Sequence, residues 1–341
     1  MYKLFISQRD KNNANAIEFY FRIIEDSIRS IGAVVERVDN FDNINADDVV
    51  ITLDAHSFFS VWRRNRKQRI INWSQGIAPE EMLFQSNGRP KEILRSYLWR
   101  LFEKIAISHA SLCIFVSDRM RQHFQKKYGY KKDNFFVMPC FNQEIDESSF
   151  TDEKYQKPTF VYAGALATWQ CFDETLDLYK KIKEAIPDAL LYLYTGEQEK
   201  AKAMVEERGI TDVTYDCVGY EEMQKVLSGK KYCFLIRQDM IINNVATPTK
   251  LNTYMAAGCI PIYSDVIDAF KDKLAPISYK IRYKGSAAQV IDSIKTLESR
   301  HISGAQVYAE YKRLFDDYYS RDKYVRELSA VLVKIFGRGK R

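Results

Sequence analysis

Short apolar runs alternate with amphipathic stretches along most of this 341-residue sequence. The apolar runs are rich in β-branched and aromatic residues, which is typical of buried strands. The stretches between them carry apolar residues at helical spacing. In the first half the strand-like runs are YKLFIS, AVVERV, DDVVITL, RIINWSQ, SLCIFVS and NFFVMP. This alternation predicts an α/β fold with a doubly wound parallel sheet and helices on both faces.

The alternation occurs twice, on either side of a polar stretch at residues 142–158. This stretch has no apolar periodicity, so we interpret it as a linker. Beyond it, strand-like runs recur in TFVYAGAL, ALLYLYTG, VTYDCVGY, KYCFLIRQ and CIPIYSD, and the tail at 303–336 is expected to be helical throughout. The length also favours two domains of about 150 residues each. We therefore predict two Rossmann-like domains, 1–148 and 149–318, with a ligand cleft between their strand ends.

The sequence shows no sign of a metal site, a disulfide framework or a membrane span. Its six cysteines are scattered, mostly inside apolar runs, and its four histidines are not closely spaced. Such cysteines are typical of reduced, buried thiols in a cytosolic protein. The N-terminus lacks the pattern of a signal peptide, and no run of about 18 apolar residues is free of charge. These features predict a cytoplasmic protein without a metal.

Positive charge is concentrated in the first half of the sequence. Between Arg63 and Lys132 there are 16 Lys and Arg residues but five Asp and Glu, whereas the whole chain has a formal charge of +6. A basic surface of this kind suits an anionic membrane, a phosphorylated acceptor or nucleic acid. No nucleic-acid-binding motif accompanies it, so we favour a membrane or a lipid diphosphate. The alternative is a set of ordinary solvated helix faces.

The segment FLIRQDMIINNVATPTKLNTYMAAGCIPIYSD carries the strongest chemical signal. A buried strand ends at Arg237, and the run TPTK (247–250) opens a short helix that Gly258 closes. Exposed N–H groups at the helix start, the threonine hydroxyls and the two cations together suit a diphosphate. The alternative is a well-capped helix beside a surface arginine.

An earlier turn, in FVYAGALATWQCFDETLDLY, gives a weaker phosphate signal. Gly164 allows the backbone to bend or to approach a ligand. The helix that begins near Phe172 or Asp173 points N–H groups at an anion. A glycine needed for the turn alone is an equal alternative.

The first domain offers acceptor-side candidates after the strand RIINWSQ, namely Gln75, Gly76, Glu80 and Glu81. Either glutamate is suited to orient or deprotonate an acceptor hydroxyl. Alternatively, the sequence Pro-Glu-Glu is only a first helical turn, where proline and acids are favoured. His56, after the strand VVITLD, is either a sugar contact or a structural histidine.

The segment TPTKLNTYMAAGCIPIYSD resembles the nucleotide-binding segment of retaining glycosyltransferases of family 4, which have the GT-B fold. CVGY…VLSGKKYCFLIRQD resembles the run that leads into that segment, and VYAGAL resembles the opening of the family's second domain. SLCIFVSDRMRQHFQKKYG…FFVMPCF and INWSQGIAPEE resemble first-domain elements. The resemblance runs in order through nearly the whole chain, and its specific part is the stretch from P-T-K to A-G-x-x-P.

The resemblance implies that a nucleotide sugar binds the second domain without a metal and that its sugar passes to an acceptor on the first. The implied donor-binding residues are Gly164, Ala165, Trp169, Gln170, Gly219, Tyr220, Arg237, Asn244, Thr247, Pro248, Thr249, Lys250, Leu251, Asn252 and Thr253. The acceptor-side residues are His56, Gln75, Gly76, Glu80 and Glu81, and the catalytic candidates are Gln75, Glu80, Arg237 and Lys250. The tail at 319–341 is expected to pack back on the first domain, as in GT-B proteins, or to pair with a neighbour.

The sequence departs from the family pattern at several positions. Val245 and Thr253 stand where the family usually carries two glutamates, the second of which contacts the donor ribose. An arginine and a lysine expected after the first turn of the second domain are also missing. We predict that Arg237 and Lys250 supply the diphosphate charge instead, and that Asn252 or Thr253 meets the ribose hydroxyls.

The expected activity is therefore transfer of a sugar to a lipid-linked saccharide or polysaccharide, as in capsule or O-antigen assembly, at the inner membrane face. Two alternatives remain at this point. One is a non-catalytic relative that binds a partner or a glycan. The other is a different GT-B enzyme, such as a nucleotide-sugar epimerase or a phosphorylase.

Overall fold

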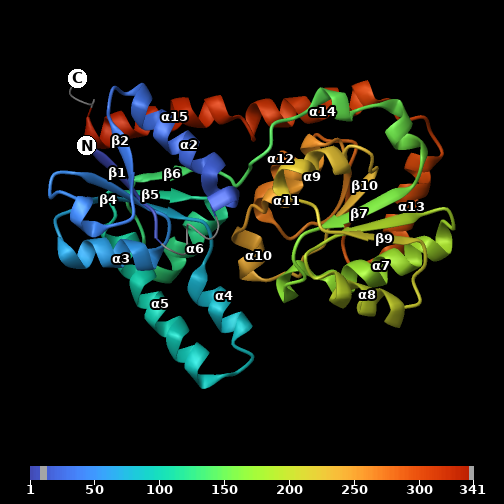
Figure 1. Cartoon of the computed structure of the whole chain (residues 1–341), viewed down its shortest axis with the longest axis horizontal. Helices are drawn as coiled ribbons and strands as arrows, with labels where there is room; N and C mark the ends of the chain where they lie inside the picture. Colours follow the sequence, from blue (N-terminus) through green and yellow to red (C-terminus); the bar gives the residue numbers. More distant parts are fainter. Residues whose placement is uncertain (8–13, 338–341) are drawn as a thin grey trace. The chain divides into compact units, whose positions relative to one another are not determined.

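The computed structural model describes residues 1–7 and 14–337. The chain folds into two compact units (Figure 1). The first unit comprises the described residues of Met1–Cys140, Val245–Thr247 and Ser320–Arg341. The second unit comprises Phe141–Asn244 and Pro248–Tyr319.

The first unit is built on a six-stranded parallel sheet with the order β2-β1-β3-β4-β5-β6. Its strands are β1 (Tyr2–Phe5), β2 (Val35–Val38), β3 (Val49–Thr52), β4 (Arg69–Ser74), β5 (Leu112–Phe115) and β6 (Phe135–Val137). Its helices are α2 (Ala14–Ser30), η1 (Phe41–Asn43), α3 (Ala55–Arg64), α4 (Ala78–Gln85), α5 (Pro90–His109), α6 (Asp118–Tyr128) and α15 (Arg321–Phe336).

The second unit repeats this plan, with the strand order β12-β11-β10-β7-β8-β9 and parallel pairing throughout. Its strands are β7 (Thr159–Ala163), β8 (Leu190–Tyr194), β9 (Val213–Asp216), β10 (Tyr232–Leu235), β11 (Ile260–Ser264) and β12 (Ile281–Tyr283). The remaining helices are η2 (Glu147–Ser149), η3 (Asp152–Gln156), η4 (Thr168–Gln170), α7 (Phe172–Ala185), α8 (Gln198–Glu207), α9 (Tyr220–Leu227), α10 (Ile241–Val245), α11 (Thr249–Ala256), α12 (Asp268–Lys273), α13 (Ala287–Glu298) and α14 (Gly304–Asp317). Two parallel sheets with flanking helices confirm the predicted fold class.

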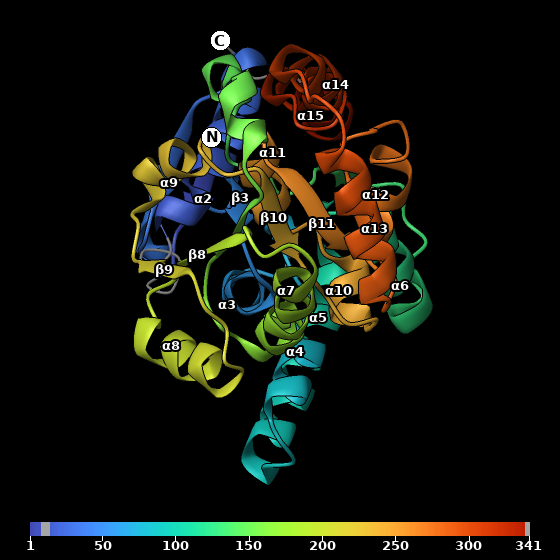
Figure 2. The ribbon, with the colours of Figure 1, turned by 90° about the vertical axis from the view of Figure 1, so that its right-hand side faces the viewer.

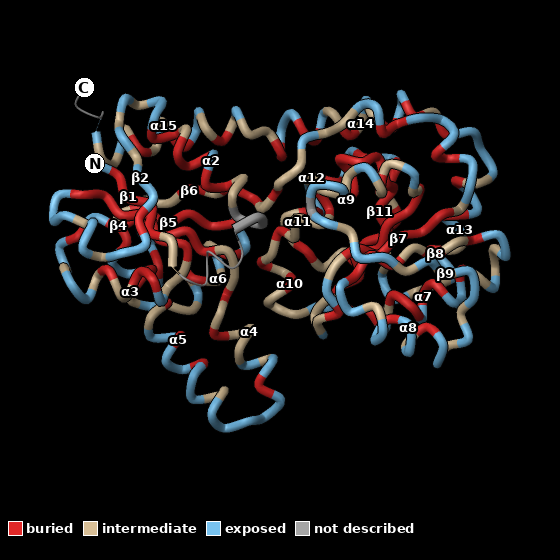
Figure 3. Tube along the Cα trace, viewed as in Figure 1, coloured by how far each residue is buried: buried red, intermediate tan, exposed pale blue. Residues whose placement is uncertain are grey.

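The central strands are apolar because both faces of each sheet are covered. Every residue of β3, β5, β7, β10 and β11 is buried. The edge strands β2 and β9 instead mix exposed and partly buried residues. Figure 3 shows the buried segments running along the strands of each sheet. Burial on both faces explains why the central runs lack the polar alternation of a half-exposed strand. None of the described helices has the combination of length and apolarity that a bilayer crossing requires.

The C-terminal tail is helical as predicted, except for a short break that divides it into two helices. α14 ends at Asp317, and α15 begins after Ser320. The Ser320 hydroxyl accepts a hydrogen bond from the backbone N–H of Lys323 at 3.4 Å. A serine in this position caps a new helix, which separates the two helical segments.

The helix α15 packs against α2 in the first unit. Arg321 forms an ion pair with Asp26. The Ser329 hydroxyl donates a hydrogen bond to the backbone oxygen of Ser27 at 3.1 Å. Leu328 and Leu332 of α15 are buried. The last helix of the chain therefore contributes to the core of the first unit.

The polar segment after Cys140 is held by the second unit, although its composition predicts a free linker. Asn252 is fully buried, and its Oδ1 accepts hydrogen bonds from the backbone N–H groups of Asn142 at 2.9 Å and Gln143 at 2.8 Å. Its Nδ2 donates to the backbone oxygen of Gln143 at 3.0 Å. The first continuous stretch of the first unit ends at Cys140, and the Asn252 amide is one of the contacts that hold the following residues in the second unit.

Replacing Asn252 by alanine leaves the backbone N–H groups of Asn142 and Gln143 without their acceptor. We expect Asn252→Ala to lower the free energy of unfolding by about 2–4 kcal/mol, since each buried unpaired group costs about 1–3 kcal/mol. Urea denaturation followed by circular dichroism measures this loss. Gln289→Ala, which removes an exposed amide from α13, is the matched control and should stay within about 0.5 kcal/mol of the parent. Equal losses in the two variants would contradict the role assigned to Asn252.

Candidate functional site

The carboxyl end of β7 meets the start of α11 in the second unit. β7 is followed by Gly164, whose φ of 130° favours glycine. A Cβ atom at this position would lie 2.5 Å from Cε and 2.6 Å from Nζ of Lys250. The backbone angle therefore favours glycine, and a Cβ atom here would displace the end of the Lys250 side chain.

Lys250 lies in the first turn of α11 and reaches two polar groups near β7. Its Nζ lies 4.4 Å from the centroid of the Tyr162 ring. The same nitrogen donates a hydrogen bond to Oε1 of Gln170 at 2.9 Å. Gln170 is the last residue of η4, the short helix after the Gly164 turn. The lysine thus connects α11 to the turn that follows β7.

Arg237 follows β10 and is buried, with 6% of its surface exposed. Its Nη1 donates to the backbone oxygens of Gln170 at 3.1 Å and Ile236 at 2.8 Å. Its Nη2 donates to Oε1 of Gln170, the oxygen that also accepts from Lys250. One neutral amide therefore serves two cations. We refer to Tyr162, Gly164, Gln170, Arg237 and Lys250 as the cation cluster.

The cation cluster carries positive charge that no carboxylate balances. Within residues 1–7 and 14–337, neither Arg237 nor Lys250 is ion-paired with Asp or Glu. Burial lowers the pKa of Arg237. Burial, and then the charge of Arg237, hold the pKa of Lys250 well below its usual value. A bound anion would oppose both effects, because a negative charge favours the protonated lysine.

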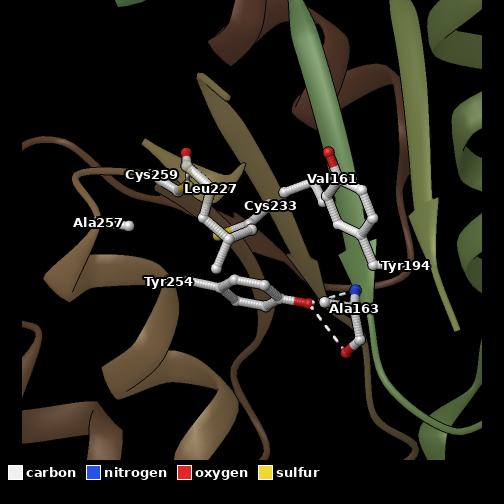
Figure 4. Packing of buried hydrophobic residues seen from close by; sticks show 8 residues of the cluster. All are labelled: Val161, Ala163, Tyr194, Leu227, Cys233, Tyr254, Ala257 and Cys259. Atoms are coloured by element: carbon white, nitrogen blue, oxygen red, sulfur yellow. Dashed lines mark hydrogen bonds between the residues drawn. The ribbon is translucent and has the colours of Figure 1, made fainter. Parts of the chain in front are cut away.

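Tyr254 fixes α11 against the end of β7 (Figure 4). Its hydroxyl accepts a hydrogen bond from Ala163 N at 2.8 Å and donates to Ala163 O at 3.3 Å. The other buried residues of this cluster are Val161, Tyr194, Leu227, Cys233, Ala257 and Cys259. Lys250 lies four residues before Tyr254, on the same face of the helix. The tyrosine therefore sets the position at which Lys250 meets Gly164.

The helix α11 begins without a side-chain cap. Its N-cap residue is Pro248, whose position matches the predicted helix start. The hydroxyl of Thr247 is buried and accepts a hydrogen bond from Cys140 N at 2.9 Å, and its contact with a diphosphate stays a prediction. Thr249 is the first helical residue and is partly buried. A helix start without a capping side chain keeps its N–H groups available to an anion.

Three other predicted donor-binding residues have structural roles in the second unit. The buried amide of Asn252 holds residues 142–143, and its contact with a ribose hydroxyl stays a prediction. The amide of Asn244 donates to the Asp239 carboxylate at 2.8 Å. Leu251 is fully buried in the core. These residues support the framework of the site.

Of the remaining predicted donor-binding residues, some lie in the turn after β7, beside the cation cluster, and others lie elsewhere in the second unit. Ala165 is exposed and Trp169 partly buried, both in the turn after β7. The Thr253 hydroxyl donates to a backbone oxygen of its own helix at 3.2 Å. Gly219 is exposed just before α9, and none of the described contacts joins it to the cluster. The side chain of Tyr220 lies outside the described part of the structure.

Glu80 belongs to a charge network in the first unit. Lys127 Nζ lies 2.6 Å from Oε1 of Glu80 and 2.6 Å from Oε2 of Glu103. Tyr128 donates to Oε2 of Glu103 at 2.6 Å. Burial alone raises the pKa of Glu80, but hydrogen bonds from His123 and Lys127 outweigh it and lower that pKa. These contacts connect Glu80 of α4 to α6, while its predicted role toward an acceptor hydroxyl stays a prediction.

Glu81 caps α4 from within the same helix. Its Oε1 accepts a hydrogen bond from the backbone N–H of Ile77 at 3.2 Å. A Cβ atom at Gly76 would lie 2.4 Å from that oxygen, so the glycine makes room for the capping carboxylate. Gln75 is partly buried just beyond the end of β4. Gln75 and Glu80 are two of the four predicted catalytic residues, and Glu80 is ion-paired with Lys127.

His56 lines a hollow of about 830 Å³ in the first unit. Its ring stacks on Trp99, with centroids 5.8 Å apart. Arg89, Arg95 and Phe102 of the α5 region also line the hollow. Asp54 and Glu92 line the hollow as well, so aromatic faces stand beside charges of both signs, which suits a sugar. Sequence reasoning missed the α5 residues because their spacing predicts only a packed helix.

The sequence matches no protein-family model and no curated protein. Solved structures nevertheless share its fold. Sucrose-phosphate synthase from Thermosynechococcus elongatus has a TM-score of 0.70 at 12% identity, over 98% of this chain and 98% of that one. Anabaena HepE, solved in complex with UDP, has a TM-score of 0.68 at 11% identity, over 98% and 100%. Among the described residues, no group of three or more His, Cys, Asp or Glu is arranged to hold a metal.

Two further structures extend the comparison. WaaG, a glycosyltransferase involved in lipopolysaccharide biosynthesis, has a TM-score of 0.59 at 13% identity, over 98% of this chain and 99% of that one. TarM, from S. aureus, has a TM-score of 0.64 at 11% identity, over 84% of this chain but 55% of that one. The chain thus spans about half the length of TarM. These similarities establish that the chain has the GT-B fold of glycosyltransferases.

Removing the charge of Lys250 is expected to stabilise the protein. Its pKa is lower in the folded chain than in the unfolded chain, so the unfolded chain binds more protons between the two pKa values. We expect Lys250→Met to raise the free energy of unfolding by about 0.5–2 kcal/mol at neutral pH. The gain should shrink as the pH rises toward about 10.4, the pKa of unfolded lysine.

Thermal unfolding at several pH values between about 7 and 10 measures both effects, because this range lies below the pKa of unfolded lysine. Lys180→Met, at an exposed position of α7, is the matched control and should change stability by less than about 0.5 kcal/mol. Lys250→Met could instead lower the free energy of unfolding, or raise it by an amount that does not depend on pH. Either result would show that the charge of Lys250 does not destabilise the folded protein.

Proposed function

We propose that the protein is a glycosyltransferase that moves a sugar from a nucleotide donor to a lipid-linked saccharide or polysaccharide. The observation that carries this proposal is the cation cluster, in which Arg237 and Lys250 share one neutral amide and have no carboxylate partner in the described structure. A nucleoside diphosphate supplies the missing negative charge. The GT-B fold and the UDP bound in the HepE structure support this assignment.

In the proposed reaction, the bond between the sugar and the diphosphate breaks, the acceptor oxygen bonds to the anomeric carbon, and the proton of the acceptor hydroxyl passes to the departing diphosphate. Negative charge then builds on the departing diphosphate. Arg237 and Lys250 stabilise that charge, with the uncapped start of α11 adding backbone N–H groups. Their fixed positions matter most in the transition state, where the charge is largest. Retention at the anomeric carbon and independence from a metal are part of the same proposal.

The first unit is the proposed acceptor-binding part. The hollow beside His56 and Trp99 has a volume of about 830 Å³ and basic residues at its border. That size accommodates one or two sugar rings, given that ligand pockets typically span about 300–1,000 Å³. WaaG acts in lipopolysaccharide biosynthesis, which supports a cell-surface glycan precursor as the acceptor class. We place this reaction on the cytoplasmic side of the membrane, in capsule or O-antigen assembly.

A second candidate function is a non-catalytic relative that binds a partner or a glycan. The observation that favours it lies at positions 245 and 253. Val245 is buried and Thr253 is bonded within its own helix, so neither offers a carboxylate to a donor ribose. A protein of this kind needs no donor and should not bind a nucleoside diphosphate.

Nucleotide binding distinguishes these two functions. We expect one of UDP, GDP, dTDP, CMP and ADP to raise the thermal stability without added metal, by about 2.7 kcal/mol at 100 times its Kd. Arg237→Ala should lose most of this effect. Because Arg237 is buried and that variant is at risk of unfolding, Lys250→Met is the more decisive test. It should be stable on its own and still bind the nucleotide at least about tenfold more weakly, since a charge-assisted contact contributes about 1.5–3 kcal/mol.

Isothermal calorimetry on the same samples gives the affinities, and Lys180→Met serves as the control with parent-like binding. Absence of binding by every nucleotide, in a folded parent protein, would favour the non-catalytic relative. Parent-like binding by a folded Lys250→Met would place the nucleotide outside the cation cluster.

Gly164→Ala tests the close approach between the turn and Lys250. The added Cβ would fall 2.5 Å from Cε of Lys250, and the φ of 130° is unfavourable for alanine. We expect a loss of about 1–3 kcal/mol in stability and a weaker nucleotide affinity, because the lysine must move. Gly196→Ala is the matched control, since a Cβ there meets no atom within 4 Å. Thermal shift with and without the nucleotide separates the two effects, and parent-like affinity in Gly164→Ala would contradict the assigned lysine position.

A further inference from the structure

The helices α4 and α5 form a hairpin in the first unit, which we call the α4–α5 hairpin (residues 78–109). Its turn contains two consecutive left-handed residues, Asn87 with φ 46° and Gly88 with φ 79°. The Ser86 hydroxyl donates to the backbone oxygen of Leu83 at 2.7 Å and closes the end of α4. The tip of the hairpin projects away from the sheet of its own unit (Figures 1 and 2).

A row of apolar side chains runs along α5 on the surface of the first unit. Leu94, Tyr97, Leu98 and Leu101 are 67%, 62%, 50% and 50% exposed. Their spacing of three, four and seven residues places them on one face of the helix. Leu83 of α4, at 52%, adds to the exposed apolar surface of the hairpin. Single exposed leucines are ordinary, but a continuous row of this kind marks an interaction surface.

The charges around the row all have the same sign. The exposed charged residues of α4, α5 and their turn, His109 aside, are Arg89, Lys91, Arg95, Arg100 and Lys104. The four glutamates of the hairpin are buried or partly buried: Glu80, Glu81, Glu92 and Glu103. The acids thus face the protein while the cations face outward. The surface that surrounds the apolar row is therefore cationic.

A smaller hollow beside the row is also basic. It has a volume of about 380 Å³, and Tyr97 and Leu101 of the apolar row lie on its border. Its other lining residues are Arg100, Lys104, Lys127 and Tyr128. Lys127 and Tyr128 are bonded to Glu103, which leaves Arg100 and Lys104 as the cations of this hollow that match the oxygens of a phosphate. An apolar row thus adjoins a hollow suited to an anionic headgroup.

We propose that the α4–α5 hairpin docks on the surface of an anionic phospholipid bilayer. Leu94, Tyr97, Leu98 and Leu101 enter the boundary between headgroups and acyl chains. Arg100 and Lys104 contact lipid phosphates from the side of the row. A leucine row with a tyrosine and a cationic border is the composition of helices that lie in a membrane interface. An acidic protein would match the charge, but it would not account for the row of aliphatic side chains between the cations.

This inference is independent of the proposed function, because docking on a bilayer requires neither nucleotide nor acceptor. The full chain is mixed with vesicles of phosphatidylcholine, alone or with about one third phosphatidylglycerol, and the bound fraction is measured by flotation. We expect binding to the anionic vesicles only, weakening as salt is raised, since charged contacts at the surface are screened.

Two variants test the two parts of the surface. Leu94→Gln/Leu101→Gln removes half of the apolar row and should lower the vesicle affinity by about a hundredfold, since two leucines leave the apolar region of the membrane boundary. Arg100→Glu/Lys104→Glu should lower it by about 30-fold or more, because each basic residue near an anionic surface contributes about 1 kcal/mol. Val34→Gln, at a residue 59% exposed elsewhere in the first unit, and Lys180→Glu/Lys202→Glu, in the second unit, are the matched controls.

Circular dichroism and thermal unfolding confirm that each variant is folded. Failure of the parent chain to float with anionic vesicles would overturn the proposal. Equal binding by Leu94→Gln/Leu101→Gln and Val34→Gln would also overturn it, since the apolar row would then play no part. A parent dimer that becomes monomeric in the leucine variant, without vesicle binding by either, would assign the row to contact between copies of the chain.

Discussion

The hydrogen bonds between the Tyr254 hydroxyl and both backbone atoms of Ala163 determine the geometry of the second unit's site. They join the last residue of β7 to α11, two elements that are far apart in sequence. Because these bonds fix α11 against the end of β7, Lys250 lies directly against Gly164. Its Nζ donates a hydrogen bond to Oε1 of Gln170. The aromatic ring is buried, so the hydroxyl has no water to compete for its bonds. The chemistry of the site thus depends on a tyrosine that is itself removed from any ligand.

The cation cluster differs from the other buried lysines of the second unit in how its charge is accommodated. Lys231 Nζ lies 2.7 Å from the Glu298 carboxylate and donates to Tyr155 O at 2.6 Å. Lys154 is surrounded by backbone oxygens, and burial lowers its pKa. The charge of Lys230 also helps to lower the pKa of Lys154. Arg237 and Lys250 share a single neutral amide, and burial together with the charge of Arg237 lowers the pKa of Lys250, so the charged lysine is held at a cost in stability. Such a cost is common where a site is built for binding rather than for stability.

The alternation of strand and helix predicted both sheets, because continuous apolar runs and helical spacing reflect local burial. The sequence also pointed to Arg237 and Lys250, since a cation at the end of an apolar strand and one at a helix start are visible locally. It did not predict the break before α15, which depends on the Ser320 cap, or the role of Asn252, which depends on a contact between residues about 110 positions apart. Tyr162 and the α5 row were missed for the same reason. Whether an aromatic or a leucine is covered depends on long-range packing that spacing does not reveal.

The path of the chain through the two units also constrains how such a protein can evolve. The chain passes between the units four times, after residues 140, 244, 247 and 319, so neither unit is one continuous stretch of sequence. A gene rearrangement that exchanged only residues 1–140 would combine the sheet and α2 of one relative with the α15 of another. The Arg321–Asp26 pair and the buried leucines of α15 would then meet an unmatched α2. Recombination between relatives that replaces the first unit must therefore carry the last helix with it, which couples two distant ends of the gene.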